Sequence, residues 1–488
     1  MKYFVFKLNY YETRQEAGGK LSRVLGAVIF YTLLALIVLV AIPYGTVEPW
    51  WEALFECVVF ALGALWVIDG LLRRGAWVWK EHVVFLPILL IALYAFLQTL
   101  SGLSESSTVS GLKVWSAISA DPFETRLSVL KLLALILSGV MLLRYTSSRL
   151  RLRALICTLI GVGLLSALFG ILRQTTQHST GFFLPFLQAG SGYGQFINRN
   201  HFAFLMEMVL GLTLGLIVGG GVRRDHVLTY LALALPVWVA LVLCNSRGGL
   251  FSMLAEALFL ALLFSFKREA GPNELEVSGI ERRSLSRKLA QARIARPLLV
   301  AGLVALVFIG ALWIGGEALT SRLETVSSEM GVESVGQGNE GVRRLEVWRA
   351  TWALIKEHPL AGVGFNGYWA AIPLYHQASG ELTPQQAHND YLELLASGGV
   401  IGVLLVLWFC VLLVKSIKRS FQAKDGFLRA ASLAAAAGLF GVAVHSMVDF
   451  GLHITINALI FTALVVIAVA SDKVETRMRN QEPATHQV

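Results

Sequence analysis

The sequence predicts an all-α fold: a polytopic bundle of about twelve transmembrane helices with one large helical loop outside the membrane. Hydrophobic residues make up 56% of the 488 residues and charged residues only 15%, against roughly 25% charged residues in soluble proteins. Several continuous apolar runs approach the ~20 residues that a helix needs to cross a bilayer. These observations exclude a soluble globular enzyme, a disordered chain and a coiled coil. They also exclude a lipid-spanning barrel, whose strands alternate in polarity.

The apolar runs predict twelve spans in order along the chain. The first run is too long for the core of a signal peptide and lacks a small-residue cleavage site, so we expect it to remain as an anchor. The expected spans are 24–44, 50–72, 83–100, 126–145, 154–173, 201–219, 226–245, 248–266, 297–316, 393–414, 427–447 and 452–471.

Basic residues indicate which side of the membrane each loop faces. The N-terminus, alternate loops and the C-terminus hold 30 of the 41 Lys and Arg residues, including the basic run from Lys267 to Arg296. Because cytoplasmic loops carry the excess of Lys and Arg, both termini are expected in the cytoplasm, which requires an even number of spans. This distribution accounts for the net charge of +9 without a nucleic-acid partner.

The chain divides into three parts. Residues 1–316 hold spans one to nine, with an exposed cytoplasmic linker at about 268–296. Residues 317–390 form a long loop on the outside face between spans nine and ten, here called the lid loop. Residues 391–488 hold spans ten to twelve and a cytoplasmic tail. Loops as long as the lid loop are usually functional.

The lid loop is expected to contain a helix that covers the bundle. His358-Pro359 ends the helical pattern, because proline cannot continue a helix. The apolar residues of this pattern are Leu345, Trp348, Trp352 and Ile355.

Two other patterns are interpreted as structural. Gly362-Val-Gly364-Phe-Asn-Gly367 fits a dinucleotide-binding fingerprint, but a helix precedes it where that fingerprint needs a strand, so it predicts a helix stop and a tight turn. The four cysteines lie in apolar segments without C-x-x-C spacing. They are therefore expected to be buried structural thiols rather than zinc or redox ligands.

A histidine stands where the lid loop re-enters the membrane. His388-Asn389 is followed by Gly398, Gly399 and Gly402. An interfacial imidazole can take up a proton near neutral pH, so His388 is a candidate general base. The structural alternative is a histidine that caps a helix, followed by glycines that allow close helix packing.

Arginines lie at the same face. Arg247 follows Ser246 in the turn between the seventh and eighth spans, and Arg343-Arg344 begin the lid helix. Guanidinium groups match phosphate oxygens, so these arginines are candidates for binding an anion. The alternatives are a snorkelling Arg247 and surface pairing of the arginine pair with Glu340 or Glu346.

The outside mouth of the sixth span is unusually polar. It contains Asn198-Arg199-Asn200-His201, of which Asn198 or Asn200 can cap the helix. Glu207 lies deeper in the same helix, where a buried carboxylate requires a partner. Weaker candidates on the outside face are Asp121-Pro122, His445 and Asp449.

Paired aspartates are missing from the sequence. The seven aspartates are at least 23 residues apart, whereas many metal-dependent glycosyltransferases hold a divalent cation on a diphosphate with paired carboxylates. We therefore expect no metal site and no cofactor. Arginines on the outside face would neutralise a diphosphate instead, which favours a lipid diphosphate over a nucleotide sugar as the donor.

Four motifs together resemble the O-antigen ligase and polymerase-like membrane glycosyltransferases of bacteria. The ligase signature is His, then Asn, Ser or Gln, nine residues, Gly, two residues, then Gly, Thr or Tyr, and the stretch from His388-Asn389 to Gly399-Val-Ile-Gly402 fits it. The resemblance covers roughly residues 100–470. The other three motifs are Asn198-Arg-Asn-His201, Ser246-Arg247-Gly248, and Arg344-Leu-Glu-Val-Trp348 through Gly364.

The resemblance implies metal-independent, inverting transfer from an undecaprenyl-diphosphate-linked glycan to lipid A core or another glycan acceptor. It places the protein in the bacterial inner membrane with a periplasmic active site. His388 would be the general base, with Arg247 and Arg344 at the donor diphosphate. The remaining candidates for substrate binding are Arg199, Asn198, Asn200, His201, Asn389 and Arg343.

Several functions stay open at this stage. The family includes ligases, repeat-unit or exopolysaccharide polymerases and protein O-oligosaccharyltransferases. A transporter of lipid-linked sugars is the alternative from another class, favoured by the intramembrane charges Lys131, Glu207 and Glu256.

Overall fold

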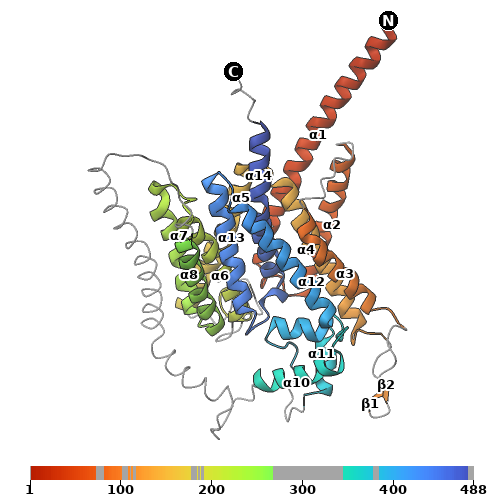
Figure 1. The fold of residues 1–488 in the computed structure, drawn as a ribbon, viewed down its shortest axis with the longest axis vertical. Coiled ribbons are helices and arrows are strands. Elements are labelled where there is room, and N and C mark those ends of the chain that lie inside the picture. The colour runs from red at the N-terminus through yellow and green to blue at the C-terminus, as the bar shows by residue number, and fades with distance from the viewer. Residues whose placement is uncertain are drawn as a thin grey trace, which may run out of the picture.

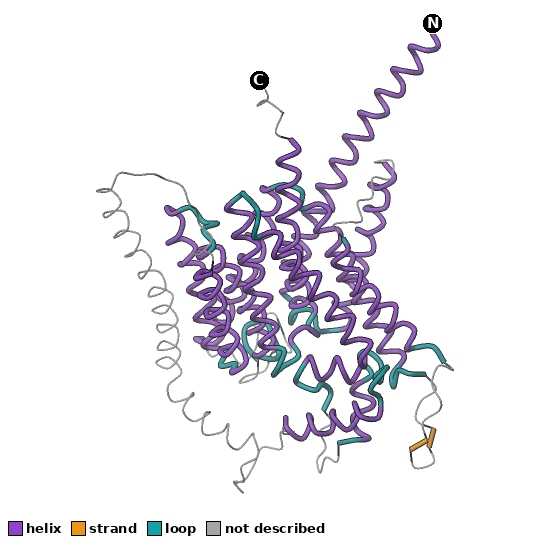
Figure 2. Tube along the Cα trace, viewed as in Figure 1, coloured by secondary structure: helices purple, strands orange, loops and turns teal. Residues whose placement is uncertain are grey.

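The computed structural model is almost entirely helical (Figures 1 and 2). It describes residues 2–72, 82–101, 108–109, 112–113, 117–176, 184, 187, 192–266, 344–376 and 384–481. The helices are α1 (Lys2–Ala41), α2 (Pro49–Leu72), α3 (Leu86–Gln98), α4 (Pro122–Tyr145), α5 (Arg149–Thr175), α6 (Arg199–Val218), α7 (Val227–Leu243), α8 (Arg247–Phe266), α10 (Arg344–Glu357), α11 (Tyr368–Ala371), α12 (Asp390–Ser420), α13 (Gly426–His445) and α14 (Thr455–Gln481). A small antiparallel ribbon pairs β1 (Thr108–Val109) with β2 (Leu112–Lys113).

The chain is a multi-pass membrane protein. Within the described part of the chain, nine helices are long and apolar enough to cross a membrane, namely α1, α2, α4, α5, α6, α7, α12, α13 and α14. The third and eighth expected spans correspond to the shorter apolar stretch Val83–Gln98 and to α8. The ninth expected span at 297–316, the linker at 268–296 and lid-loop residues 317–343 lie outside the described residues. A total of twelve spans therefore remains a prediction.

Side-chain caps begin many of these helices where the sequence supplies an acceptor. A helix leaves its first backbone N–H groups without partners, and a Ser, Asn or Asp side chain can accept from them. Asp121 caps α4 with its carboxylate, accepting from the backbone N–H groups of Phe123 and Glu124 at 3.1 Å. Further side-chain caps are Ser148 for α5, Asn198 for α6, Ser246 for α8, Asn389 for α12 and Asp425 for α13.

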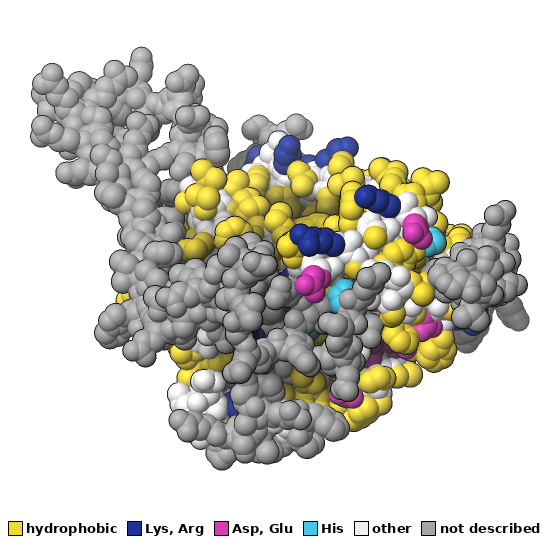
Figure 3. All heavy atoms as spheres, turned by 90° about the horizontal axis from the view of Figure 1, so that it is seen from below, with side chains coloured by type: hydrophobic (Ala, Val, Ile, Leu, Met, Phe, Trp, Pro, Cys, Tyr) yellow, Lys and Arg dark blue, Asp and Glu magenta, His cyan; other side chains and the backbone are white. Residues whose placement is uncertain are grey.

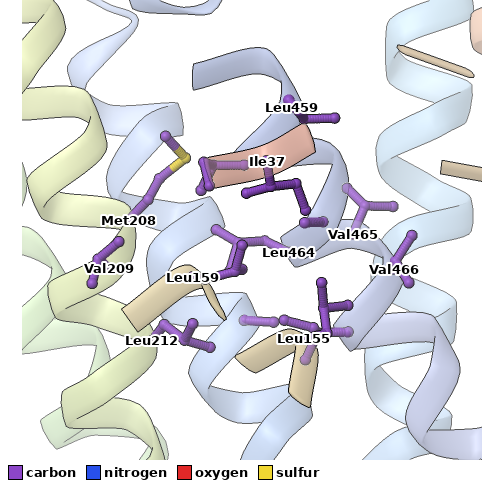
Figure 4. Packing of buried hydrophobic residues seen from close by; sticks show 14 of the residues in the cluster. Ile37, Leu155, Leu159, Met208, Val209, Leu212, Leu459, Leu464, Val465 and Val466 are labelled. Carbon is purple, nitrogen blue, oxygen red and sulfur yellow. The ribbon is translucent and has the colours of Figure 1, made fainter. Parts of the chain in front are cut away.

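The core of the bundle is formed by α6, α13 and α14. More than four fifths of their most apolar stretches are buried (83%, 83% and 82%), against 28% for α2 and α7 and 22% for α12. Figure 4 shows side chains from α1, α5, α6 and α14 meeting in this core. The peripheral helices therefore present most of their apolar surface to lipid.

Small residues bring α6 and α13 into close contact. A Cβ added at Gly215 would lie 2.4 Å from the Cα of Ala434, and one added at Gly211 would lie 2.8 Å from the backbone nitrogen of Gly438. Lipid tails are as apolar as leucine, so helices in a membrane associate through close packing of this kind. The small-xxx-small pattern on both helices accounts for their position at the centre of the bundle.

The lid loop is joined to a kink in α12. Gly399 has a φ of 59° and a ψ of −164°, which interrupts the helix. The turn at 359–364 docks there, and the backbone N–H of Val400 donates to the carbonyl of Pro359 at 2.9 Å. A Cβ at Gly399 would lie 2.2 Å from the carbonyl oxygen of Leu360. Only glycine fits, and the lid turn satisfies a backbone group that the kink releases from the helix.

Gln98, at the end of α3, fixes this joint. Its buried amide donates to the carbonyl oxygens of Ala361 and Ser397 at 2.7 and 3.1 Å. One side chain thus links α3, the lid turn and α12, so the described part of the lid loop is built into the bundle. In Figure 1, α10 and α11 lie at the end of the bundle opposite the start of α1 and the end of α14.

Candidate active site

One buried carboxylate joins three of the polar motifs. Asp449 lies in the loop between α13 and α14, and its side chain is 1% exposed. Its Oδ1 lies 3.4 Å from Nδ1 of His388, and its Oδ2 lies 3.6 Å from Nη2 of Arg344. The side-chain amide of Asn200 also donates to Oδ2. Asp449 therefore holds together the starts of α6, α10 and α12.

The charges around Asp449 keep it ionised. Burial by itself raises the pKa of a carboxyl group, but the close imidazole of His388 and the positive charge of Arg344 lower the pKa of Asp449 to about 2. The carboxylate is thus negative at any physiological pH. A fixed negative charge beside an imidazole stabilises the imidazolium form when the ring takes up a proton.

His388 is held by the backbone on both sides. It has a left-handed φ of 51° and directly precedes Asn389, whose side chain caps α12 by accepting from the backbone N–H groups of Tyr391 and Leu392 at 3.0 Å. The cap is therefore Asn389, so the alternative in which His388 caps the helix is wrong. Because Nδ1 faces Asp449, Nε2 is the nitrogen available for proton transfer.

Trp348 supports the same segment from the lid helix. Its indole Nε1 donates to the carbonyl oxygen of Ala387 at 2.9 Å, and the backbone N–H of Ala387 donates to the buried carboxylate of Glu393 at 2.9 Å. His388 is 37% exposed. The imidazole is thus accessible on a backbone that is fixed by α10 and α12.

The lid helix is confirmed as α10, and it ends at Glu357 directly before His358-Pro359. The expected apolar face is wrong in part. Leu345 and Trp352 are exposed, and the face that packs on the bundle is formed by Val347, Ala350, Thr351, Leu354 and Ile355. The packed face includes a small and a polar residue, because Thr351 shares a hydrogen bond of 2.6 Å with Tyr368. Of the expected large apolar residues, only Ile355 therefore belongs to the packed face.

Arg344 begins α10 with its guanidinium toward Asp449 and a side chain that is 44% exposed. A guanidinium has five N–H donors, so the contact with Asp449 leaves donors for a further anion. Arg343 lies outside the described residues.

Phe450 packs against three imidazoles. Its ring centroid lies 4.7 Å from that of His201, 4.9 Å from that of His388 and 5.8 Å from that of His453, each near an edge-to-face arrangement. His453 was not among the expected site residues. Its Nε2 lies 3.6 Å from Asp390 and 3.5 Å from Glu393.

His453 is held in its uncharged form. Burial, together with the positive charges of Lys131 and His201, lowers the pKa of His453 to about 4. It is therefore neutral at physiological pH, which suits a structural role beside His388. The sequence did not reveal His453, because a histidine near the end of a short loop belongs to no motif that distinguishes it from other interfacial histidines.

The polar mouth of the sixth expected span contributes two positions to this site. Asn198 is the N-cap of α6 and accepts from the backbone N–H of Asn200 at 2.8 Å. Asn200 reaches Asp449, and His201 is 7% exposed beside Phe450. Arg199 is the first residue of α6 and is half-buried.

Arg247 directly precedes a glycine that packs against the end of α13. It is the first residue of α8 and is half-buried, and Ser246 caps the helix by accepting from the backbone N–H of Gly249 at 3.2 Å. A Cβ at Gly248 would lie 2.4 Å from His445 and 3.0 Å from Val448. The start of α8 therefore packs directly against the loop that carries Asp449.

A buried pair lies beneath that loop. Oε2 of Glu207 and Nδ1 of His445 are joined by a hydrogen bond of 2.9 Å, and both side chains are fully buried. This is the partner that the buried carboxylate was expected to need. The carbonyl oxygen of His445 accepts from the backbone N–H groups of Val448 and Asp449 at 2.9 and 3.2 Å. The pair thus anchors the end of α13 from which Asp449 extends.

A cavity of about 1030 Å³ opens beside His388. His388, His201, Phe450 and His453 line one part of it, and residues of α2 and α4 line another. Figure 3, which looks onto this end of the molecule, shows basic, acidic and histidine side chains among hydrophobic ones. Arg344, Arg247 and Arg199 are not among the residues that line the cavity.

Two interpretations of structural patterns are now decided. The glycine pattern at 362–367 is a tight turn in which Gly362, Gly364 and Asn366 have positive φ, as expected.

The expectation of four buried thiols is wrong, because only Cys244 is buried and Cys57, Cys157 and Cys410 are exposed. Apolar helices in a membrane have an apolar outer face as well as an apolar inner one, so an apolar setting does not place a thiol in the core.

No metal-binding cluster is found within the part of the chain that the structure describes: no three His, Cys, Asp or Glu side chains there are placed to hold an ion. The candidate site instead consists of a histidine, a buried carboxylate and an arginine.

A comparison with protein families gives a match over residues 231–409, to a family described as O-antigen ligase. The matched segment runs from α7 into α12 and contains Arg247, Arg344 and His388. No curated protein matches the chain. Over residues 231–409, this multi-pass membrane protein carries a domain of the O-antigen ligase family.

Proposed function

We propose that the protein is a glycan transferase of the O-antigen ligase type. It moves a saccharide from a polyprenyl diphosphate, of the undecaprenyl kind, onto a hydroxyl group of lipid A core or another glycan. The reaction takes place at the periplasmic face of the bacterial inner membrane. The family match over residues 231–409 and the membrane-spanning helices support this assignment.

The chemistry is a single displacement at the anomeric carbon. The acceptor hydroxyl attacks C1 of the donor sugar, the bond from C1 to the diphosphate oxygen breaks with inversion, and polyprenyl diphosphate leaves. Nε2 of His388 takes the hydroxyl proton, while Asp449, 3.4 Å from Nδ1, fixes the tautomer and stabilises the imidazolium. Such general-base help is worth roughly 10²–10⁴-fold in rate.

The leaving diphosphate carries negative charge that must be neutralised. We propose that Arg344 and Arg247 supply the positive charge in place of a divalent cation. Arg344 is partly exposed beside Asp449, and Arg247 begins α8 beside the Asp449 loop. Preformed donors at a developing charge are among the largest contributions to catalysis.

The observation that carries the proposal is the shared carboxylate. Asp449 contacts His388, from the start of α12, and Arg344, from the start of α10. The proposed base thus contacts one oxygen of this buried carboxylate, and the proposed anion-binding group contacts the other. A reaction in which a hydroxyl group displaces a diphosphate requires both groups close together.

The test uses purified protein with an undecaprenyl-diphosphate-linked glycan and rough lipopolysaccharide as the acceptor, with EDTA and without ATP. Product should form with the unmodified protein, and His388→Ala should reduce the rate by about 10²-fold or more. His226→Ala is the matched control, because His226 is exposed in the turn between α6 and α7. Activity that is lost in EDTA and restored by Mg²⁺ contradicts the role of the arginines.

The acceptor is decided in cells. A deletion strain that accumulates long unligated polymer supports the ligase, and one that accumulates single repeats supports the polymerase of the same family. Transport is tested in vesicles: movement of labelled donor across the bilayer by a protein that forms no product contradicts the transferase.

A further inference from the structure

The cavity beside His388 has a charged wall that the mechanism above does not use. Glu52 and Glu56 of α2 line it, together with Glu124 and Lys131 of α4. These four residues are here called the carboxylate wall. They belong to helices that lie outside the family match.

Charges in this wall lie within membrane-spanning helices. Glu52 and Glu56 are in the first two turns of α2, and Lys131 is about 13 Å along α4 from its start. Ionisable residues inside spans are costly, and they usually mark a polar cavity with a function. The wall therefore needs an explanation beyond packing.

Lys131 is neutralised within the wall. Its Nζ donates to Oε2 of Glu52 at 3.1 Å and to the carbonyl oxygen of His453 at 2.8 Å. Glu124 accepts from the side-chain amide of Asn366 at 3.1 Å. Glu56, by contrast, accepts no hydrogen bond from any residue that the structure describes. With one lysine against three glutamates, the wall is acidic.

A polar group without a partner lies elsewhere in the same cavity. His201 lines it and is 7% exposed, and its Nε2 has no hydrogen-bond partner among the described residues. A buried polar atom without a partner is unfavourable. A ligand that both donates and accepts hydrogen bonds would satisfy this nitrogen and the carboxylate of Glu56 together.

We propose that the carboxylate wall binds the hydroxyl groups of the acceptor saccharide and presents one of them to His388. This inference rests on the proposed function. A sugar hydroxyl donates to a carboxylate and accepts from an amide or ammonium group. The wall offers carboxylates and an ammonium group, and the amides of Asn198 and Asn366 line the same cavity. The wall is continuous with His388, because both line the same cavity.

The same charges do not suit the donor diphosphate. Like charges repel across a binding site, so an acidic wall disfavours an anion there. The diphosphate therefore stays on the side of Arg344, whereas the uncharged hydroxyls of the acceptor occupy the wall. The donor saccharide also carries hydroxyl groups that could bind the wall. Separate KM values for the acceptor and the donor distinguish these two possibilities.

The sharpest variant is Glu56→Gln, which keeps the shape of the side chain and breaks no hydrogen bond among the described residues. The KM for rough lipopolysaccharide should rise about tenfold, because a hydrogen bond to a carboxylate is replaced by a weaker one to a neutral amide oxygen. The KM for the lipid-diphosphate donor should change less than twofold. Asp225→Asn, at an exposed carboxylate in the turn between α6 and α7, is the control. A rise confined to the donor KM overturns the inference.

A binding measurement separates this inference from the proposed function. Calorimetry with the core oligosaccharide released from rough lipopolysaccharide should give equal affinity for the unmodified protein and His388→Ala, and about tenfold weaker affinity for Glu56→Gln. The double variant Glu52→Gln/Lys131→Met removes both charges of the ion pair and should also weaken binding. Unchanged affinity in both wall variants overturns the inference. Saccharide binding without any transfer would leave it standing and refute the proposed function.

Discussion

Replacing Asp449 by asparagine tests the centre of the candidate site. Asparagine keeps the shape of the side chain and an oxygen that can accept from the backbone N–H of Phe450, which lies 3.0 Å from Oδ1. What it removes is the negative charge between His388 and Arg344. Asp449→Asn should therefore lower the catalytic rate while the protein stays folded.

The size of the effect follows from the distance. Two unit charges 3.4 Å apart interact by about 5 kcal/mol at an effective dielectric constant of about 20. The His388 side chain is 37% exposed, so solvent screening leaves roughly 2 kcal/mol for the imidazolium that forms in the reaction. This corresponds to a fall of about 30-fold in kcat.

The assay measures kcat with donor and acceptor both saturating, so that binding effects are excluded. Asp225→Asn serves as the control, and thermal unfolding in detergent checks that the Asp449 variant is folded. A folded Asp449→Asn protein with the kcat of the unmodified enzyme would refute the reasoning, as would an effect that appears only in KM.

Four further outcomes are expected. The pKa of Asp449 is about 2, against 3.8 in the unfolded chain. This difference contributes about 2 kcal/mol of stability above about pH 4, which is lost as the pH falls toward 2. The midpoint temperature of unfolding should therefore fall more steeply between pH 4 and 2 in the unmodified protein than in Asp449→Asn. Gly215→Val should lower the free energy of unfolding by about 1–3 kcal/mol through overpacking against α13, whereas Gly161→Val, with no atom near its added Cβ, should have little packing effect. Arg344→Ala should lower kcat about 10²–10³-fold, with partial recovery in Arg344→Lys, and equal rates in both variants would contradict a charged contact with the diphosphate. Trp348→Phe should lower kcat roughly fivefold, because about 1 kcal/mol of hydrogen bonding that fixes the segment before the imidazole is lost; an unchanged kcat would exclude this support.

Much of the fold follows from the sequence because the bilayer imposes simple rules. Apolar runs near ~20 residues must be helical in lipid, and the described runs are helices. His388 and Arg344 were selected because polar residues stand out on a face that is poor in cations, and the structure brings them to one carboxylate. That carboxylate, Asp449, was only a weak candidate. A single aspartate in a short loop has no spacing that reveals which distant segments it contacts.

The errors concern which side of a helix is buried. Periodicity identifies an apolar face, but in a membrane both the lipid-facing and the inward-facing sides of a helix are apolar. Cys57, Cys157 and Cys410 lie on the exposed side, and the lid helix packs through Ala350 and Thr351 rather than through Trp352. Which side is buried depends on small residues that allow close approach, and hydrophobicity does not report them.

The position of Asp449 after Arg344 and His388 in the chain has a consequence for biogenesis. His388 and Arg344 are synthesised well before the loop that carries Asp449. We expect that loop to be fixed only when α13 and α14 have both entered the bundle. A nascent chain that already contains His388 but not yet Asp449 therefore lacks the assembled candidate site. We therefore expect the proposed transfer activity to appear only after the α13–α14 hairpin is inserted.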